Sequence, residues 1–418
     1  MQNAARNRAG QEDVILRIET IRELHGVTRL RDEWRGLQAR CPNATPFQTW
    51  EWNQAWITHF GARKRPLVLL FRSETGELLG IAPLYVSFHL GTPLRRLAWM
   101  GTGASDYMDA LTLPEHSDSI AAFLRHYLKN DLRGWDIADL QQLRDDSPLL
   151  KKTEVRSQKT ENRKQKTEVK RRKLDEAESC LPMEPCPHLK LPETWEEVTA
   201  GLGKKMRSNL GYYARLLTKT FPDAAYSLAD ETNVQVGMTA LFDLHQKRWN
   251  ARWLPGVLGN KRTQAFHRDI AAQFLEQGWL RLHLLTIDGA IRSVLYCFQW
   301  NERTYYYLGG FAPEFGKYSL GTLLTGHAIQ HAITEKSREF DFLRGNEPYK
   351  YRWLPQERIN QRLILLNGRD SFGGLGELPG KAGLALNRME RYVEHRAKAF
   401  AEQRKSADKQ ARKIDSQP

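Results

Sequence analysis

Two long apolar stretches, each interrupted by one short polar turn, restrict the folds open to this chain. The first is PLVLLFRSETGELLGIAPLYVSF at residues 66–88, and the second is LRLHLLTIDGAIRSVLYCFQW at residues 280–300. Each contains two β-rich runs joined by a turn, TGE in the first and DGA in the second, which is the pattern of a β-hairpin. We therefore predict an antiparallel strand pair in each half of the chain.

The elements predicted around each hairpin follow the same order in both halves. Helical periodicity precedes the hairpin, and a strand, a helix and a further strand follow it. These later segments are residues 95–101, 117–130 and 135–143 in the first half, and residues 303–311, 320–337 and 338–345 in the second. Hairpins give antiparallel pairs and strand–helix–strand steps give parallel ones, so mixed sheets are expected. The predicted fold is α/β in the broad α+β sense, with two similar units whose sheets are flanked by helices.

A lysine-rich internal repeat separates the two predicted units. KTEVRSQ, KTENRKQ and KTEVKRR are consecutive heptads that begin at Lys152, Lys159 and Lys166. Only Val155 and Val169 are apolar, so the two apolar positions that each heptad of a coiled coil requires are missing. We predict a solvated or disordered insert without a catalytic role, with an electrostatic tether as the alternative. The expected domains are residues 14–148 and 181–370, with the insert at 149–180 and a basic helical tail at 371–418.

The positive charge of the chain lies mostly outside the two predicted units. The formal net charge is +14. Residues 151–173 contain eleven Lys or Arg and three Glu, and residues 381–418 contain ten Lys or Arg and five Asp or Glu, so the remainder is close to neutral. This distribution argues against a nucleic-acid-binding body, although we expect the insert and tail to make weak electrostatic contacts with RNA or an anionic membrane.

Cysteine usage and hydropathy add further limits. The four cysteines are scattered, and CLPMEPC has no second Cys or His pair nearby, so neither a metal site nor a disulfide framework is predicted. The opening MQNAARNRAGQED is polar and lacks the apolar core of a signal peptide. No run approaches the roughly 18 apolar residues that span a bilayer. We therefore expect a protein of the reducing cytoplasm.

A glycine-containing loop opens the helix predicted after the third strand of the second half. A helix begins with backbone N–H groups that lack partners and with a partial positive charge, and glycine lets an anion come close to them. Lys317 adds charge and Ser319 adds a donor. The predicted anion site, which suits a pyrophosphate, comprises Gly316, Lys317, Ser319, Leu320, Gly321 and Thr322. The alternative is a plain turn in which Ser319 only caps the helix.

This hairpin, third strand, loop and helix resemble the coenzyme A-binding segment of GNAT acyltransferases. The loop of that family usually reads Arg/Gln-x-x-Gly-x-Gly/Ala. KYSLGTLL matches it at Lys317 and Gly321, whereas Thr322 and Leu323 replace the final small residue. The resemblance implies tandem GNAT-like domains and an acyl-CoA co-substrate, with acetyl-CoA the first choice, and no metal.

A wider set of segments resembles the CelD/BcsL-like branch, which is associated with bacterial exopolysaccharide synthesis. The matching segments are TPFQTWEWNQAWITHFG, LGIAPLY, GASDYMD, KKMRSNLGYYARLL, HQKRW and FDFLRGNEPYKYRW. FemAB-type peptidoglycan aminoacyltransferases are more distant relatives. The resemblance implies direct acyl transfer, in a ternary complex, to a sugar, a saccharide precursor or another amine or hydroxyl.

The block FDFLRGNEPYKYRW supplies the predicted catalytic residues Asp341, Tyr349 and Lys350. Asp341 is expected to end a strand. Tyr349, Lys350 and Arg352 are expected to alternate in an extended stretch, which would send Lys350 to the face opposite Tyr349. Lys350 would then steady an oxyanion or a negative group of the acceptor. The alternative is a structural ion pair between Asp341 and Lys350 or Arg352.

Other residues are candidates for binding the acceptor. Aromatic rings and carboxylates suit sugar or peptide groups, and a carboxylate such as Asp106 or Asp109 would bind an amine or act as a base. The candidates are Trp50, Glu51, Trp52, Asp106, Tyr107, Arg207, His245 and Arg352. The structural alternatives are an apolar helix face for residues 50–52, a polar turn for the aspartates, a solvated helix face for Arg207 and a core position for His245.

Two other functions stay open from the sequence. A FemAB-like enzyme would use aminoacyl-tRNA to modify a peptidoglycan precursor, although the heptad insert cannot form the coiled-coil arm that such enzymes often carry. A non-enzymatic nucleic-acid-binding or scaffold protein would depend on the basic insert and tail. The near-neutral body, which has no nucleic-acid-binding motif, argues against this last function.

Overall fold

The computed structural model describes residues 15–88, 93–151, 178–250 and 258–367. The predictions for the heptads and for the basic tail fall on residues outside these ranges. The chain divides into two compact units. Among the described residues, unit 1 holds those up to residue 187 together with 343–346 and 356–367, and unit 2 holds 188–342 and 347–355.

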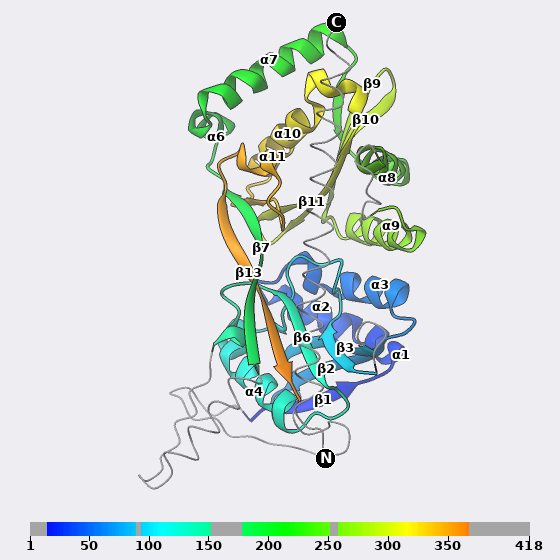
Figure 1. The fold of residues 1–418 in the computed structure, drawn as a ribbon, viewed down its shortest axis with the longest axis vertical. Helices are drawn as coiled ribbons and strands as arrows, with labels where there is room; N and C mark the ends of the chain where they lie inside the picture. The colour runs from blue at the N-terminus through cyan, green and yellow to red at the C-terminus, as the bar shows by residue number, and fades with distance from the viewer. Residues whose placement is uncertain (1–14, 89–92, 152–177, 251–257, 368–418) are drawn as a thin grey trace, which may run out of the picture. The chain divides into compact units, whose positions relative to one another are not determined.

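Unit 1 is built on a mixed sheet. Its strands are β1 (Arg17–Ile21), β2 (Arg65–Arg72), β3 (Leu78–Phe88), β4 (Arg95–Trp99), β5 (Leu111–Thr112), β6 (Ile137–Leu143), β13 (Gln356–Leu366) and the part of β7 (Glu178–Lys190) up to residue 187. Its helices are α1 (Leu24–Arg29), α2 (Arg31–Ala39), α3 (Trp50–Phe60) and α4 (Ser117–Asn130), with 3-10 turns η1 (Pro46–Gln48), η2 (Pro114–His116) and η3 (Pro148–Leu150). The strands lie in the order β1-β2-β3-β4-β6-β13-β7, with β5 paired to β3. Figure 1 labels β1, β2, β3, β6, β7 and β13 of this series. Among the pairs of described strands from β1 to β13, β5 included, only β4 and β6 are parallel.

The strands of unit 2 also pair in both directions. Its strands are β8 (Ala225–Leu228), β9 (Leu280–Ile287), β10 (Ala290–Trp300), β11 (Arg303–Phe311), β12 (Glu339–Asp341) and the end of β7 (Glu178–Lys190). Its helices are α6 (Trp195–Gly201), α7 (Lys204–Thr220), α8 (Val234–Asn250), α9 (Lys261–Glu276), α10 (Leu320–Thr334) and α11 (Pro348–Tyr351), with the 3-10 turn η5 (Pro313–Tyr318). The strand order is β8-β9-β10-β11-β12-β7.

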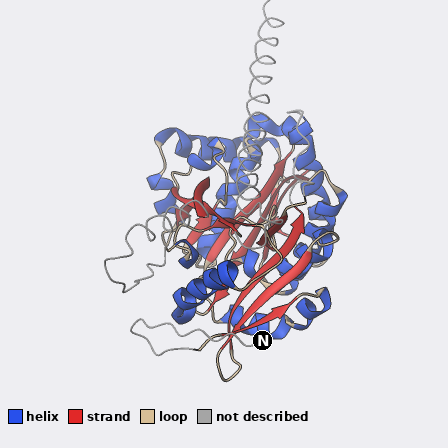
Figure 2. Cartoon of the chain, turned by 60° about the horizontal axis from the view of Figure 1, so that its bottom comes forward, coloured by secondary structure: helices blue, strands red, loops and turns tan. Residues whose placement is uncertain are grey.

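The two units repeat one plan. In each, a short edge strand, a hairpin and a third strand are followed by a helix that leads to a parallel strand, and an antiparallel strand closes the series. The crossover helix is α4 in unit 1 and α10 in unit 2. Helices flank the strands, as Figure 2 shows. Both predicted hairpins are present as β2–β3 and β9–β10, and the predicted α/β fold with mixed sheets is confirmed.

Two local features differ from the sequence analysis. Residues 348–351 form the short helix α11, so the prediction of an extended, alternating stretch at Tyr349–Arg352 is wrong. Pro348 occupies the first helical turn, where its missing N–H costs nothing. The strand β7 was not predicted at all, because Pro182, Pro185 and Pro187 remove donors that a sheet ladder uses.

The core of unit 2 lies between its sheet and helices α6, α7 and α10. It is formed by buried side chains that include Leu285, Leu295, Leu324, Ile329 and Phe340. Among the described residues, no helix is long and apolar enough to cross a bilayer.

Candidate functional site

The parallel strands β11 and β12 separate after a short stretch of pairing. They are paired from Arg303 to Tyr305 on β11, and β12 ends at Asp341. From Tyr306 to Phe311, the described strand that pairs with β11 is β10, on its other edge. The register of that pair also shifts between Tyr296 and Cys297, which is a β-bulge. The second half of β11 therefore presents an edge that β12 does not cover.

A cavity of about 200 Å³ lies beside this part of β11. Strands β10 and β11, the turn η5, the first turns of α10 and the segment around α11 all contribute to its wall, and α7 adds Met206. We call it the donor cavity. Its lining residues from β11 and the loop are Tyr306, Gly309, Gly310, Phe311, Gly316, Ser319, Leu320, Gly321, Thr322 and Thr325, and those near α11 are Tyr349, Arg352 and Trp353.

Ser319 shapes the start of α10 at the wall of the donor cavity. Its backbone is left-handed, with φ 53° and ψ 44°. The Ser319 hydroxyl does not cap the helix; it donates to the Thr322 hydroxyl at 3.0 Å, while the Ser319 carbonyl accepts the N–H groups of Thr322 and Leu323. Within the described residues, the N–H groups of Leu320 and Gly321 have no acceptor. Two backbone donors at the positive end of the helix are thus left for a ligand.

The charge next to these donors comes from Arg352. Arg352 is exposed and lines the donor cavity, and the described residues offer its guanidinium no hydrogen-bond or ion-pair partner. Lys317, which was predicted to belong to the anion site, is absent from the cavity wall, and its ammonium lies 4.9 Å from the centre of the Tyr318 ring. A guanidinium and two helix-terminal amides form a site that favours an anion such as a phosphate.

Glycine keeps the space beside these donors open. A Cβ atom at Gly321 would lie 3.2 Å from the Phe311 ring, and one at Gly309 would lie 2.5 Å from the Tyr306 hydroxyl and 2.8 Å from Leu295. A Cβ at Gly316 would meet nothing within 4 Å. Gly309 and Gly321 therefore preserve room at the cavity wall, whereas Gly316 is not needed for space.

The predicted catalytic residues do not all reach the donor cavity. Tyr349 lines it. Lys350 is buried and does not line it, and its ammonium lies 3.0 Å from the carboxylate of Glu347. Asp341 is buried in β12, between Tyr305 of β11 and His188 of β7. Sequence reasoning did not single out Met206, Ser293 or Trp353, because they are brought to the cavity only by tertiary packing.

The residues predicted for the acceptor side are mostly interior positions. In unit 1, Trp50 donates to the Val27 carbonyl, Glu51 pairs with Arg35 at 2.6 Å, and Trp52 donates to the Ser105 hydroxyl at 2.8 Å. Asp106 is buried and pairs with Arg344 at 2.6 Å, and the ring of Tyr107 packs under Arg358.

In unit 2, His245 is buried on α8, and Arg207 donates to the carbonyls of Ala200 and Leu202. Of the predicted acceptor residues, Arg352 alone lines the donor cavity.

In the described part of the chain, no group of three or more His, Cys, Asp or Glu side chains is placed to hold a metal ion.

Known proteins are similar to this chain in part of its sequence and in its fold. Residues 204–351, from α7 to α11, match the family described as "Acetyltransferase (GNAT) domain". No curated protein matches the chain. Among solved structures, FemX superposes with a TM-score of 0.57 at 10% identity over 84% of this chain and 98% of that chain. The likeness to FemX shows a shared fold.

Two further solved structures are similar at lower scores. The C-terminal domain (DUF2156) of a putative lysylphosphatidylglycerol synthetase from Agrobacterium fabrum has a TM-score of 0.49 at 11% identity, over 88% of this chain and 96% of that chain. A tandem GNAT protein from the clavulanic acid biosynthesis pathway has a TM-score of 0.41 at 11% identity, over 83% and 98%.

Proposed function

We propose that the chain is a GNAT-type acyltransferase that holds the diphosphate of an acyl-CoA, acetyl-CoA in the first instance, at the start of α10. The observation that carries this proposal is the pair of N–H groups at Leu320 and Gly321, which face no protein acceptor beside a cavity that also receives Arg352. The match of residues 204–351 to an acetyltransferase domain supports it.

The chemistry of such a transfer asks little of the protein side chains. The acceptor nitrogen or oxygen attacks the thioester carbonyl carbon, the carbon–sulfur bond breaks, and the sulfur leaves as a thiolate that takes up a proton. Tyr349 lines the cavity and is our candidate for supplying that proton. The acceptor loses a proton to solvent or to a base. The uncovered edge of β11 is the place where backbone N–H groups would orient the thioester.

Our proposal for the acceptor class rests only on the resemblance of the sequence to a known family. The CelD/BcsL-like pattern favours a sugar or saccharide precursor of exopolysaccharide or cell-envelope synthesis, acylated on an amine or a hydroxyl in the cytoplasm. Asp341 and Lys350, buried next to the cavity-lining segment, would serve as positioning residues for Tyr349 and Arg352 rather than as groups that touch the substrate.

The donor assignment is tested by calorimetric titration of the full chain with acetyl-CoA. We expect Gly321→Val to weaken binding at least tenfold, because a branched side chain would block the approach of phosphate to the helix amides. Gly201→Ala is the matched control, since its Cβ meets nothing within 4 Å and the residue is not part of the cavity wall. Unchanged affinity in the Gly321 variant would reject the loop as the diphosphate site.

A FemAB-like transferase that takes its acyl group from aminoacyl-tRNA is the second candidate. The likeness to the FemX fold favours it, and so does helix α7, which contacts η5 and α10 and carries exposed Lys204, Lys205, Arg215 and Lys219 without any Asp or Glu. Filter binding of an aminoacyl-tRNA distinguishes the two donors. Saturable binding of the tRNA that Arg352→Gln weakens, with no binding of acetyl-CoA, would select this second function.

A further inference from the structure

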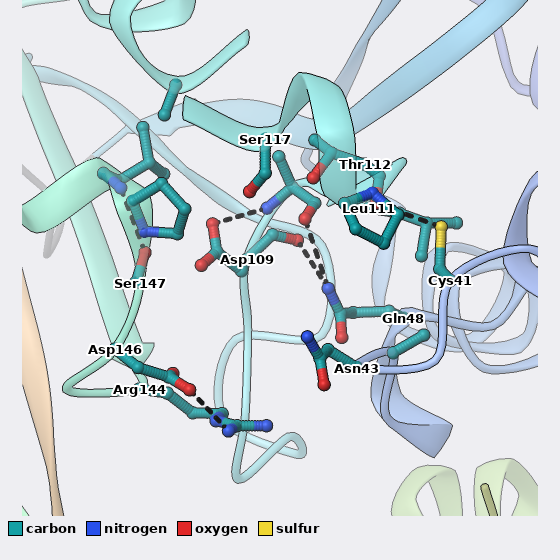
Figure 3. A pocket seen from close by; sticks show the side chains of 16 residues that line it. Cys41, Asn43, Gln48, Asp109, Leu111, Thr112, Ser117, Arg144, Asp146 and Ser147 are labelled. Atoms are coloured by element: carbon teal, nitrogen blue, oxygen red, sulfur yellow. Dashed lines mark hydrogen bonds and ion pairs between the residues drawn. The ribbon is translucent and has the colours of Figure 1, made fainter. Parts of the chain in front are cut away.

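Unit 1 contains a cavity of its own, beside its crossover helix α4. It has a volume of about 160 Å³ and is drawn in Figure 3. The first turns of the crossover helix α4 and the segment that follows β6 bound it, as the first turns of α10 and the segment after β12 bound the donor cavity. The two cavities share these two boundaries, but β10 and β11 line the donor cavity, whereas no residue of β3 or β4 lines the unit 1 cavity.

Two carboxylates, those of Asp109 and Asp146, line the unit 1 cavity, whereas no carboxylate lines the donor cavity. One oxygen of Asp109 accepts the N–H of Ala110 at 2.8 Å. Burial raises the pKa of Asp109 to about 6, and the Ser147 hydroxyl partly offsets this rise. At neutral pH Asp109 is thus ionised in a site that penalises its charge, and a cationic ligand would relieve that penalty.

The loop around Asp109 is held in place by Gln48. The Gln48 amide nitrogen donates to the carbonyls of Asp109 and Ala110 at 3.4 and 3.3 Å, and its oxygen accepts the N–H of Thr45 at 3.0 Å. Figure 3 shows the two bonds from the Gln48 amide nitrogen to the loop around Asp109. Because the wall is fixed by its own hydrogen bonds, the Asp109 carboxylate is positioned before any ligand arrives.

A guanidinium lies on another part of the same wall. Arg144 donates to Asp146 at 2.7 Å, and Asp146 is largely exposed. The remaining N–H groups of Arg144 have no acceptor within the described residues, and its Nε atom is buried. Figure 3 shows Asp109 and Arg144 apart from each other, with no contact drawn between them. The cavity thus offers the Asp109 carboxylate at one point and, at another, a guanidinium that is shared with Asp146 and keeps N–H groups for a further acceptor.

We propose that this cavity binds a free α-amino acid as its zwitterion, with the Asp109 carboxylate receiving the ammonium group and the Arg144 guanidinium receiving the carboxylate. The apolar side chains of Leu111, Ala121 and Leu149 line the rest of the wall and would accept a small apolar side chain. Opposite charges at separate points distinguish a zwitterion from a simple amine or a simple acid. The site is separate from the acyl donor cavity, so either assignment can fail alone.

Calorimetric titration of the full chain with a panel of L-amino acids at neutral pH tests this proposal. We expect one or more small apolar amino acids to bind, and we expect the N-acetyl derivative and the methyl ester of the same amino acid to bind at least tenfold more weakly. An ester that binds as tightly as the free amino acid would overturn the assignment. So would the absence of any amino acid that binds with a Kd below about 10 mM.

Three variants complete the test. Asp109→Asn and Arg144→Gln should each reduce amino-acid affinity about tenfold or more, because each removes one charge of the pair. Asp145→Asn is the matched control, because Asp145 is an exposed carboxylate in the same loop that does not line the cavity. Thermal unfolding, measured on the same samples, should give a cooperative transition in all three and reports that they are folded. Equal amino-acid affinity in all three variants would overturn the proposal.

Discussion

At the scale of single residues, conformation decides which groups are available to a ligand. Ser319 stands at the N-cap position of α10, where serine normally accepts an N–H of the first turn. Its left-handed backbone turns the hydroxyl to Thr322 instead. A pattern of residue types cannot reveal this, because it depends on one dihedral angle. The alternative of Ser319 as a side-chain cap is therefore wrong, and the helix amides stay open.

Arg352 and Lys317 are two exposed cations in unit 2, of which only Arg352 lines the donor cavity. We expect Arg352→Gln to raise the Kd for the acyl donor about tenfold to a hundredfold, as the loss of a hydrogen bond to a charged group does. Lys317→Gln should change it less than about threefold, because a surface charge outside the cavity is screened. Titration at two salt concentrations checks this, and equal effects of the two substitutions would contradict the placement of Arg352.

Asp109 should lower the stability of unit 1. Its pKa in the folded chain is about 6, above its value of 3.8 when unperturbed, so the folded state ionises it less readily. The cost to the folding free energy of keeping Asp109 ionised is about 3 kcal/mol. It is present in full above pH 6 and disappears as the pH falls from 6 to below 3.8. We therefore expect Asp109→Asn to stabilise unit 1 at neutral pH and to have a much smaller effect near pH 4, as measured by urea unfolding. A variant that is less stable at neutral pH would show that Asp109 has a structural role.

At the scale of elements, the sequence predicts what short-range patterns determine. The hairpins β2–β3 and β9–β10 and the helices α4 and α10 were foreseen because alternation and helical spacing are local. The strand β7 was missed because three prolines argue against a strand, and only its partners in the sheet hold it extended. The position of Arg352 at the donor cavity was likewise not predictable, because helix α11 stands where an extended stretch with alternating side chains was expected. No local pattern indicates that β13, the last described strand, belongs to unit 1.

The two adjacent glycines of β11 should have separable roles. A Cβ at Gly310 would lie 2.9 Å from the backbone nitrogen of His245, so Gly310→Ala must push α8 away from the strand. We expect it to destabilise unit 2 by about 1 to 3 kcal/mol. Gly309→Ala would meet only the ends of the Tyr306 and Leu295 side chains, which line the donor cavity.

We expect Gly309→Ala to weaken donor binding more than it lowers the melting temperature, because flexible side chains can move into the cavity. Thermal unfolding and calorimetric titration of both variants check this pair. Gly201→Ala again serves as the control. The reverse result, with Gly310→Ala folded normally and Gly309→Ala unstable, would contradict the assignment of the two faces of β11.

At the scale of the whole molecule, the two units share a plan but differ in their buried ionisable groups. Unit 2 buries His267 and His283, and burial lowers the pKa of each to about 3, with the neighbouring histidines adding to the effect. Unit 1 contains Asp109, whose pKa is raised. The two histidines resist protonation in the folded state, whereas Asp109 accepts a proton more readily. Mild acid should therefore lower the stability of unit 2 and raise that of unit 1.

The two buried histidines make the stability of unit 2 fall as the pH falls. An unfolded histidine takes up a proton near pH 6.5, whereas His267 and His283 stay neutral in the folded chain until about pH 3. Their contribution to the free energy of unfolding is present in full above pH 6.5. It is lost as the pH falls toward 3, at about 1.4 kcal/mol per pH unit for each histidine. By about pH 5 unit 2 should have lost about 4 kcal/mol from these two groups, while Asp109 should have returned about 1 kcal/mol to unit 1.

Scanning calorimetry of the full chain at pH 7 and pH 5 should therefore show the transition of unit 2 moving to lower temperature while that of unit 1 does not. His267→Leu identifies the cause, because a side chain that cannot be protonated removes about half of the pH-dependent loss whatever it does to packing at neutral pH. A variant that keeps the full pH dependence would mean that groups other than the buried histidines control the acid response. The same comparison on Asp109→Asn should leave unit 2 unchanged and remove the acid-induced gain of unit 1, since the two groups belong to different cores.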